Sequence, residues 1–196
     1  MSPAGTIRAF IGLGNAGEEF ARTYHNAGFL FLDHAAEGAW IENKKLGASY
    51  QKRHGVLLVK PAGYMNESGR GAAAALRYFK ISPAETAVVH DDSDLPLGTA
   101  KLVFGQSAAG HHGVESVIKA FGTCDFWRLK IGIRPSGRRA GRKRKKAGEF
   151  VLSAITKADR ALLERLFQRA SVAVMENVTP LSAFTIKESG KSAFSI

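Results

Sequence analysis

Four polar residues carry the kinds of side chain that hydrolysis of an activated carbonyl group needs. His25, Asn66 and Asp91 lie in three loops near the ends of apolar runs, and Asn15 lies close to His25 in the sequence. An unperturbed histidine can take a proton from water at neutral pH, and a carboxylate on its other ring nitrogen fixes the tautomer and stabilises the imidazolium. Asparagine amides donate hydrogen bonds to a developing oxyanion. The residues therefore predict a hydrolase that has no protein nucleophile.

Each residue also has a purely structural interpretation. His25 precedes a helix start and could satisfy a local backbone group, and Asn66 could cap the alanine-rich helix that follows it. The three carboxylates Asp91, Asp92 and Asp94 could instead hold Mg²⁺ for phosphoryl chemistry. No Walker lysine motif accompanies them, which disfavours that alternative.

A glycine pattern, Gly12-x-Gly14-x-x-Gly17, matches the fingerprint of dinucleotide-binding proteins. Glu18 and Glu19 follow it directly, where a nucleotide-binding helix would present its positive end to the pyrophosphate. Two carboxylates at that place repel a dianion. We therefore expect the glycines to shape a turn that presents the asparagine and the histidine of the candidate site.

The surrounding pattern predicts the elements that position these residues. Apolar runs and alternation predict short strands at residues 7–11, 55–59, 87–89, 100–104 and 129–133. Helices are expected after Asn26, at residues 68–79 and 114–121, and from the capping pattern at Thr156. Residues 150–152 are expected to return to the sheet or to cap its edge. We predict one α/β domain over residues 1–196, with a mixed, mostly parallel sheet flanked by helices and a weakly ordered tail from about residue 179.

Composition narrows the class of protein. The chain has 196 residues, of which 45% are hydrophobic, and this suits one ordinary globular domain. No stretch is apolar for long enough to span a membrane, and residues 1–5 do not resemble a signal peptide, so we expect a cytoplasmic protein without membrane contact. Cys124 is the only cysteine, which excludes an internal disulfide and a thiol-based zinc cluster.

The net charge of +11 is concentrated in one segment. Seven lysines and arginines lie within residues 138–146 without an acidic residue. A solvated surface run is one interpretation. We favour a flexible loop over residues 136–148 that binds a polyanion, because glycines interrupt the run and strand-like segments flank it.

Taken together, the motifs resemble the bacterial-type peptidyl-tRNA hydrolase family. The similarity is colinear over about residues 7–153. The matching segments are Ile11-Gly12-Leu13-Gly14-Asn15 with Gly17, Thr23-x-His25-Asn26-x-Gly28, Lys60-Pro61, Tyr64-Met65-Asn66-x-Ser68-Gly69, His90-Asp91-Asp92-x-Asp94-Leu95-Pro96-x-Gly98, Gly110-His111-x-Gly113, Arg128-Leu129-Lys130-Ile131-Gly132-Ile133-x-Pro135 and Phe150-Val151-Leu152.

The resemblance implies a metal-independent carboxylic ester hydrolase that cleaves the bond between peptide and tRNA and recycles tRNA from stalled or aborted translation. It implies that His25 is the general base, that Asp91 orients it, and that Asn15 and Asn66 hold substrate and water, with Asn66 near the oxyanion. No cofactor and no metal are implied, and we expect a monomer. Contacts to peptidyl-tRNA, at its acceptor end and phosphate backbone, are expected from Phe20, Tyr64, Met65, His111, His112, Lys101, Lys130, Arg142, Lys143 and Arg144.

The chain departs from the family pattern at four positions besides the long basic loop. Ala16 replaces a proline, Tyr24 an arginine, Ala109 a glycine and His112 an asparagine. The last exchange puts a titratable side chain where the family has a neutral amide.

The alternative is that the chain is a noncatalytic RNA-binding relative of the same fold, similar to a splicing factor.

Overall fold

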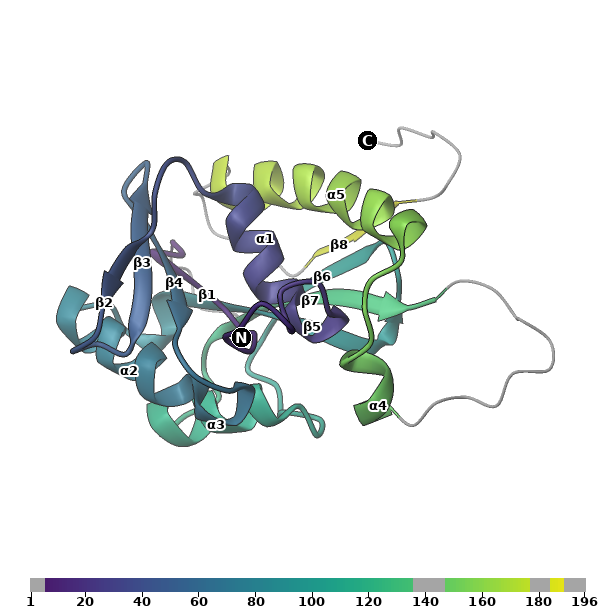
Figure 1. Cartoon of the computed structure of the whole chain (residues 1–196). Helices are drawn as coiled ribbons and strands as arrows, with labels where there is room; N and C mark the ends of the chain where they lie inside the picture. The colour runs from purple at the N-terminus through teal and green to yellow at the C-terminus, as the bar shows by residue number, and fades with distance from the viewer. Residues whose placement is uncertain (1–5, 136–146, 177–183, 189–196) are drawn as a thin grey trace.

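A computed structural model describes residues 6–135, 147–176 and 184–188, and it shows one sheet covered by helices on both faces (Figure 1). The eight described strands follow the spatial order β2-β3-β4-β1-β5-β7-β6-β8. Their bounds are β1 Ala9–Gly12, β2 Ile41–Asn43, β3 Ala48–Arg53, β4 Val56–Pro61, β5 Thr86–Pro96, β6 Thr99–Phe104, β7 Trp127–Arg134 and β8 Phe184–Lys187.

The sheet is mixed, and its parallel part is the centre. Strands β4, β1, β5 and β7 pair in parallel, whereas β2, β3, β6 and β8 join them by antiparallel pairings. The expected parallel character therefore holds for the four central strands. Parallel strands need crossover connections, and the helices supply them.

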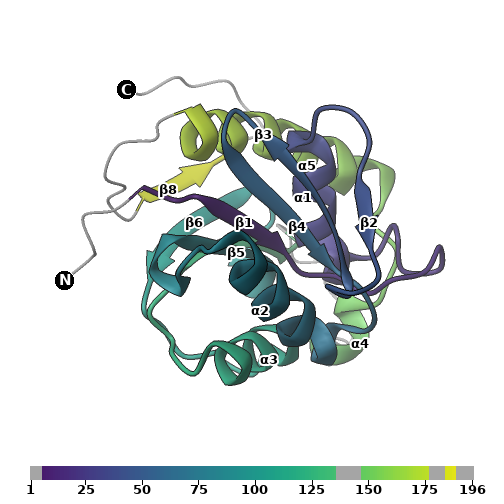
Figure 2. The same cartoon turned by 90° about the vertical axis from the view of Figure 1, so that its left-hand side faces the viewer.

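Two helices cover each face of the sheet, as the two views in Figures 1 and 2 show: α1 and α5 lie on one face, α2 and α3 on the other. Along β1, Phe10 points into the core with α1 and α5, and Ile11 points into the core with α2 and α3. The helical elements are η1 Tyr24–Asn26, α1 Ala27–Ala35, η2 Met65–Glu67, α2 Ser68–Phe79, η3 Pro83–Glu85, α3 His112–Phe121, α4 Ala147–Val151, α5 Lys157–Ser171 and the π-helix η4 Val172–Glu176.

Gly28 lets the start of α1 lie in direct contact with β5 and with the loop after β1. A Cβ atom at Gly28 would come within 2.3 Å of the Val89 carbonyl oxygen and within 2.5 Å of the Leu13 nitrogen. No side chain fits into that space, so the glycine permits a close approach of helix and sheet. The approach holds the segment that carries the candidate histidine against β5.

The structure differs from the sequence expectations in four places. The hairpin of β2 and β3 had no predicted counterpart, and β5 extends for 11 residues, so His90 and Asp91 lie within the strand. Residues 147–151 form helix α4 instead of returning to the sheet. Four residues of the expected tail, 184–187, form β8 beside β6. By contrast, α2 has the predicted bounds, and the Thr156 side chain caps α5 as expected.

Candidate active site

The candidate site forms where β1 and β5 end side by side. Gly12 of β1 pairs with Val89 of β5, so the loop after β1 and the second half of β5 meet at the same edge of the sheet. Open α/β sheets place their ligand sites outside the carboxyl ends of parallel strands. η1, which carries His25, packs against β5 at this edge.

The His25 imidazole and the Asp91 carboxylate lie in direct contact, as expected. The Nδ1 atom of His25 lies 2.9 Å from Oδ1 of Asp91. An ionised carboxylate only accepts hydrogen bonds, so Nδ1 carries the proton and donates it. This tautomer leaves Nε2 with a free lone pair, as a general base requires. The alternative that His25 satisfies a local backbone group is therefore excluded.

A second histidine binds the same carboxylate oxygen. His111 Nε2 lies 3.0 Å from Asp91 Oδ1, and the rings of His111 and His25 lie 5.1 Å apart between their centroids. The other ring nitrogen, Nδ1, accepts a hydrogen bond from the backbone N–H of Val114 and so caps α3. We expected His111 to contact the substrate, but both of its ring nitrogens already have partners within the protein.

Asp91 stays ionised although it is buried. Only 3% of its surface is exposed, and burial alone would raise the pKa of its carboxyl group. The hydrogen bonds from His111 and His25 outweigh burial and lower that pKa below its ordinary value. The neighbouring His90 is also buried, and burial together with the nearby His111 lowers its pKa to about 3. His90 is therefore neutral at physiological pH.

The side-chain amide of Asn26 holds the backbone of Asn15 in place. The Asn26 side chain accepts from the Asn15 backbone N–H at 2.9 Å and donates to the Asn15 carbonyl at 3.0 Å. It makes no capping hydrogen bond to α1. The Asn15 side-chain oxygen accepts from the Met65 backbone N–H at 2.8 Å, which joins the loop after β1 to the loop after β4.

Asn66 and its neighbours lie on that second loop. The Asn66 side chain is exposed and has no hydrogen-bond partner in the part of the chain that the structure describes, so it does not cap α2. Tyr64 is 60% exposed and meets Phe20 edge to face, with 6.4 Å between the ring centroids. Met65 instead is 5% exposed and belongs to the core, so the structure does not place it on an open groove.

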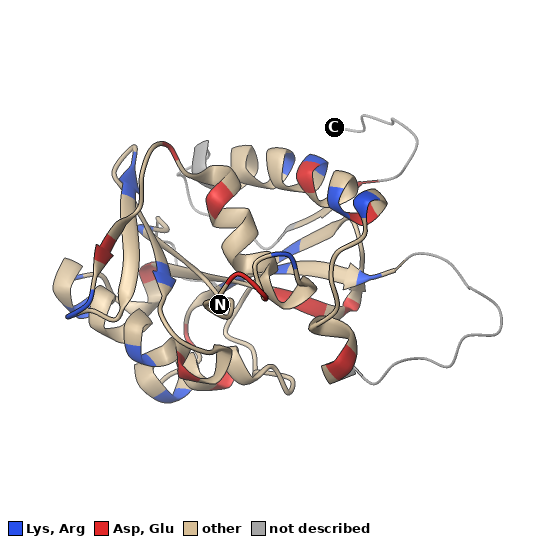
Figure 3. Ribbon diagram, in the orientation of Figure 1, with Lys and Arg blue, Asp and Glu red and all other residues tan. Residues whose placement is uncertain are grey.

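The expected tRNA contacts fall into three groups. Lys101 on β6 lies directly across from Lys130 on β7, and Figure 3 shows basic residues on these strands near the acidic end of β5. Lys130 pairs with Asp92 at 3.0 Å. His112 is exposed and pairs with Glu115 at 3.2 Å. The remaining candidates, Arg142, Lys143 and Arg144, lie outside the described residues.

Asp91, Asp92 and Asp94 do not form the alternative magnesium site, because Asp91 and Asp92 have other partners. Asp91 faces two histidines, whereas Asp92 binds Lys130 and the backbone N–H groups of Asp94 and Leu95. Within the described ranges, His25, Asp91 and His111 alone bring three ligand atoms within 4.8 Å of one another. Two hydrogen bonds already join these atoms, so the chain accounts for their proximity without an ion.

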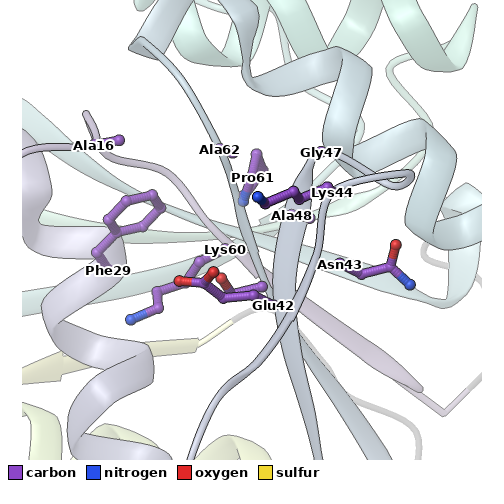
Figure 4. A pocket seen from close by; sticks show the side chains of 11 residues that line it. Ala16, Phe29, Glu42, Asn43, Lys44, Gly47, Ala48, Lys60, Pro61 and Ala62 are labelled. Carbon is purple, nitrogen blue, oxygen red and sulfur yellow. The ribbon is translucent and has the colours of Figure 1, made fainter.

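A separate groove of about 430 Å³ lies between α1 and the hairpin of β2 and β3 (Figure 4). Phe29 lines it on the α1 side and Lys44 on the hairpin side. Lys60 is held at its edge by Asp33 at 2.6 Å and by the face of Trp40, 4.1 Å from the ring centroid. Neither His25 nor Asp91 lines this groove, so the candidate general base and its carboxylate lie at the strand ends and not in this groove.

Comparison with known proteins gives a consistent result. The family model described as peptidyl-tRNA hydrolase matches residues 9–191. Peptidyl-tRNA hydrolases of Desulfitobacterium hafniense and of a Sulfurihydrogenibium species are 40% and 37% identical to the chain; the alignments cover 86% of this chain in both cases and 91% and 89% of those proteins. The crystal structure of peptidyl-tRNA hydrolase from Acinetobacter baumannii superposes with a TM-score of 0.78 at 28% identity, over 91% of each chain.

The described part of the chain contains no helix that is long and apolar enough to cross a membrane.

The motifs, the fold and the paired histidine and carboxylate agree with the match over nearly the whole length. The chain therefore belongs to the peptidyl-tRNA hydrolase family.

Proposed function

We propose that this chain hydrolyses the ester that joins a peptide to the terminal ribose of tRNA, with His25 as the general base. The observation that carries the proposal is the Nδ1 contact of His25 with Asp91, which leaves Nε2 free to take a proton from water. Membership of the peptidyl-tRNA hydrolase family supports the same reaction. Nothing in these comparisons favours a noncatalytic RNA-binding role.

The reaction needs one base and modest stabilisation of charge. Water attacks the ester carbonyl carbon while His25 Nε2 takes its proton, and the buried Asp91 carboxylate stabilises the resulting imidazolium. The amides of Asn66 and Asn15 donate to substrate and water, with Asn66 near the oxyanion. When the tetrahedral intermediate collapses, His25 returns the proton to the leaving ribose oxygen. No metal or cofactor enters this scheme.

Aromatic and basic residues divide the recognition of the substrate. The half-buried Phe20 and the exposed Tyr64 form an aromatic pair that suits the peptide side, and Met65 supports the Tyr64 loop from the core. Lys101 and Lys130 suit phosphates of the acceptor end, because the two residues lie directly opposite each other on β6 and β7. The basic segment at residues 138–146 adds sequence-independent attraction to the RNA backbone. The proposal places one chain, as a monomer, in the cytoplasm, where peptidyl-tRNA is produced.

The test is incubation of the purified chain with peptidyl-tRNA and with aminoacyl-tRNA, both without added metal. We expect release of tRNA from the first substrate only. The His25→Ala variant should keep its fold and its tRNA affinity while it loses most of its turnover, by about 10²- to 10⁴-fold. Retained tRNA binding without release by the wild type would favour the RNA-binding alternative, and normal hydrolysis by the variant would exclude His25 as the base.

A further inference from the structure

We infer that His111 is a positioning residue: it shares the Asp91 carboxylate with His25 and fixes the direction in which the general base points. The inference rests on the proposed role of His25. It replaces the sequence expectation that His111 contacts the substrate.

The first support is that the protein itself uses both ring nitrogens of His111. Nδ1 accepts from the backbone N–H of Val114 at 3.3 Å, so it carries no proton. The proton of the neutral ring must then be on Nε2, which donates it to Asp91 at 3.0 Å. The side chain is 10% exposed. No polar atom of the ring remains for a substrate.

The second support is the geometry at the carboxylate. His25 and His111 donate to the same oxygen, Oδ1 of Asp91, from two separate elements, η1 and the start of α3. The terminal torsion of an aspartate is broad, so one donor alone leaves the carboxylate free to turn. Two donors from separate elements fix it, and His25 is fixed with it.

The third support is the packing of the ring. The buried His90 ring meets His111 edge to face, with 4.7 Å between the ring centroids. His90 donates its own Nδ1–H to the Asp91 carbonyl oxygen at 2.7 Å. Because His90 remains neutral, it packs beside His111 without adding a positive charge that would disturb the shared carboxylate.

Two substitutions separate the two roles of His111. In His111→Asn the side-chain oxygen reaches about as far as Nδ1 and can still cap α3, but the side chain is too short to reach Asp91. In His111→Gln the amide N–H reaches about as far as Nε2 and can still donate to Asp91, but glutamine caps poorly. His111→Asn therefore loses the hydrogen bond to Asp91 and keeps the cap, whereas His111→Gln keeps that hydrogen bond and loses the cap.

We expect His111→Asn to lower kcat by about tenfold, with KM within about twofold of wild type, because misplacement of the base slows chemistry without weakening binding. His111→Gln should recover most of that kcat. Thermal stability does not separate the variants: His111→Gln should lose about 2–4 °C in Tm through the missing cap, and His111→Asn should lose stability as well, because the buried Asp91 carboxylate loses one of its two donors.

The order of the variants decides the inference. Normal kcat in His111→Asn with a loss in His111→Gln would reduce His111 to a helix cap. A rise in KM in both variants at unchanged kcat would show instead that His111 contacts the substrate. Wild type and His25→Ala are measured in the same assay, so failure of the proposed function shows as absent wild-type turnover.

A second measurement needs no substrate. ¹⁵N NMR of histidine side chains at neutral pH should show the proton on Nε2 in His111 and on Nδ1 in His25. A proton on Nδ1 of His111 would overturn the inference even if no turnover were detected.

Discussion

Replacing Asp91 by asparagine tests the electrostatic centre of the site. The substitution removes one charge and keeps the size of the side chain. Asp91 is 3% exposed, so water does not compensate for the lost charge. A hydrogen bond to a charged partner contributes about 1.5–3 kcal/mol. Each 1.36 kcal/mol corresponds to a factor of ten in rate, and we therefore expect kcat to fall by roughly 10- to 200-fold.

The shared oxygen explains why the expected loss of kcat stays within this range. In Ser-His-Asp hydrolases an Asp→Asn exchange lowers kcat by about 10⁴-fold, because the amide selects the wrong histidine tautomer. Here both His25 and His111 donate to Oδ1, so a single amide oxygen at that place can accept both N–H groups. His25 should then keep its proton on Nδ1. The smaller loss is the specific consequence of this geometry.

Single-turnover hydrolysis of peptidyl-tRNA measures the loss directly, and ¹⁵N NMR reports the tautomer of His25 in the same variant. A fall in kcat near 10⁴-fold with the proton on Nε2 of His25 would refute the idea that one oxygen accepts hydrogen bonds from both histidines. An unchanged kcat would show that the carboxylate does not stabilise the imidazolium.

The same variant has a defined dependence of stability on pH. The folded state lowers the pKa of Asp91, so ionisation of Asp91 stabilises the fold above its unfolded pKa of about 3.9. This contribution disappears as the pH falls through the lower folded pKa. Wild type should therefore lose stability relative to Asp91→Asn below about pH 4, as measured by urea unfolding. A relative gain on acidification would contradict the direction of the shift.

Three further predictions concern the surroundings of the site. Asn26→Ala removes two buried hydrogen bonds and should lower the free energy of unfolding by about 2–4 kcal/mol in urea titrations, whereas the exposed Asn66→Ala should leave it within about 0.5 kcal/mol; equal losses would contradict the bracing role of Asn26. Replacing Lys101 or Lys130 by alanine should reduce the slope of log affinity for tRNA against log salt by about 0.7–0.9, and an unchanged slope would exclude a phosphate contact. His112→Asn should change KM more than kcat in steady-state hydrolysis, because this exposed side chain binds only Glu115 within the described ranges; no change in either constant would place it outside the site.

Local patterns predicted the parts of the fold that depend on local physics. The alanine-rich run of α2 and the Thr156 cap of α5 can be identified from neighbouring residues in the sequence alone. Residues 150–152 contain three consecutive apolar side chains, a run too short to distinguish a strand from a helix by periodicity. In the structure Phe150 stacks on Tyr24, with 4.7 Å between the ring centroids, so tertiary packing decided the outcome in favour of α4.

The hairpin of β2 and β3 was missed for a related reason. β2 is exposed or half-buried along its length, so it lacks the alternation of apolar and polar residues that predicts a half-buried strand. β3 pairs with the edge of β4, and β2 pairs with β3 in turn. Both strands therefore depend on their partners in the sheet. β5 extends past its apolar run because the parallel partner β7 continues to pair with His90, Asp91 and Asp92.

The candidate site shows the same division between local and distant causes. Residue chemistry predicts the pairing of His25 with Asp91, because a base needs a carboxylate on its other nitrogen. The place of His111 on the same oxygen depends on where α3 begins relative to β5. Spacing along the chain does not contain that relation, and a family pattern assigns His111 to the site without assigning its partner. Asp91 therefore gains both of its donors only after folding, when His25 of η1 and His111 at the start of α3 meet one oxygen, and the orientation of the proposed base depends on both elements.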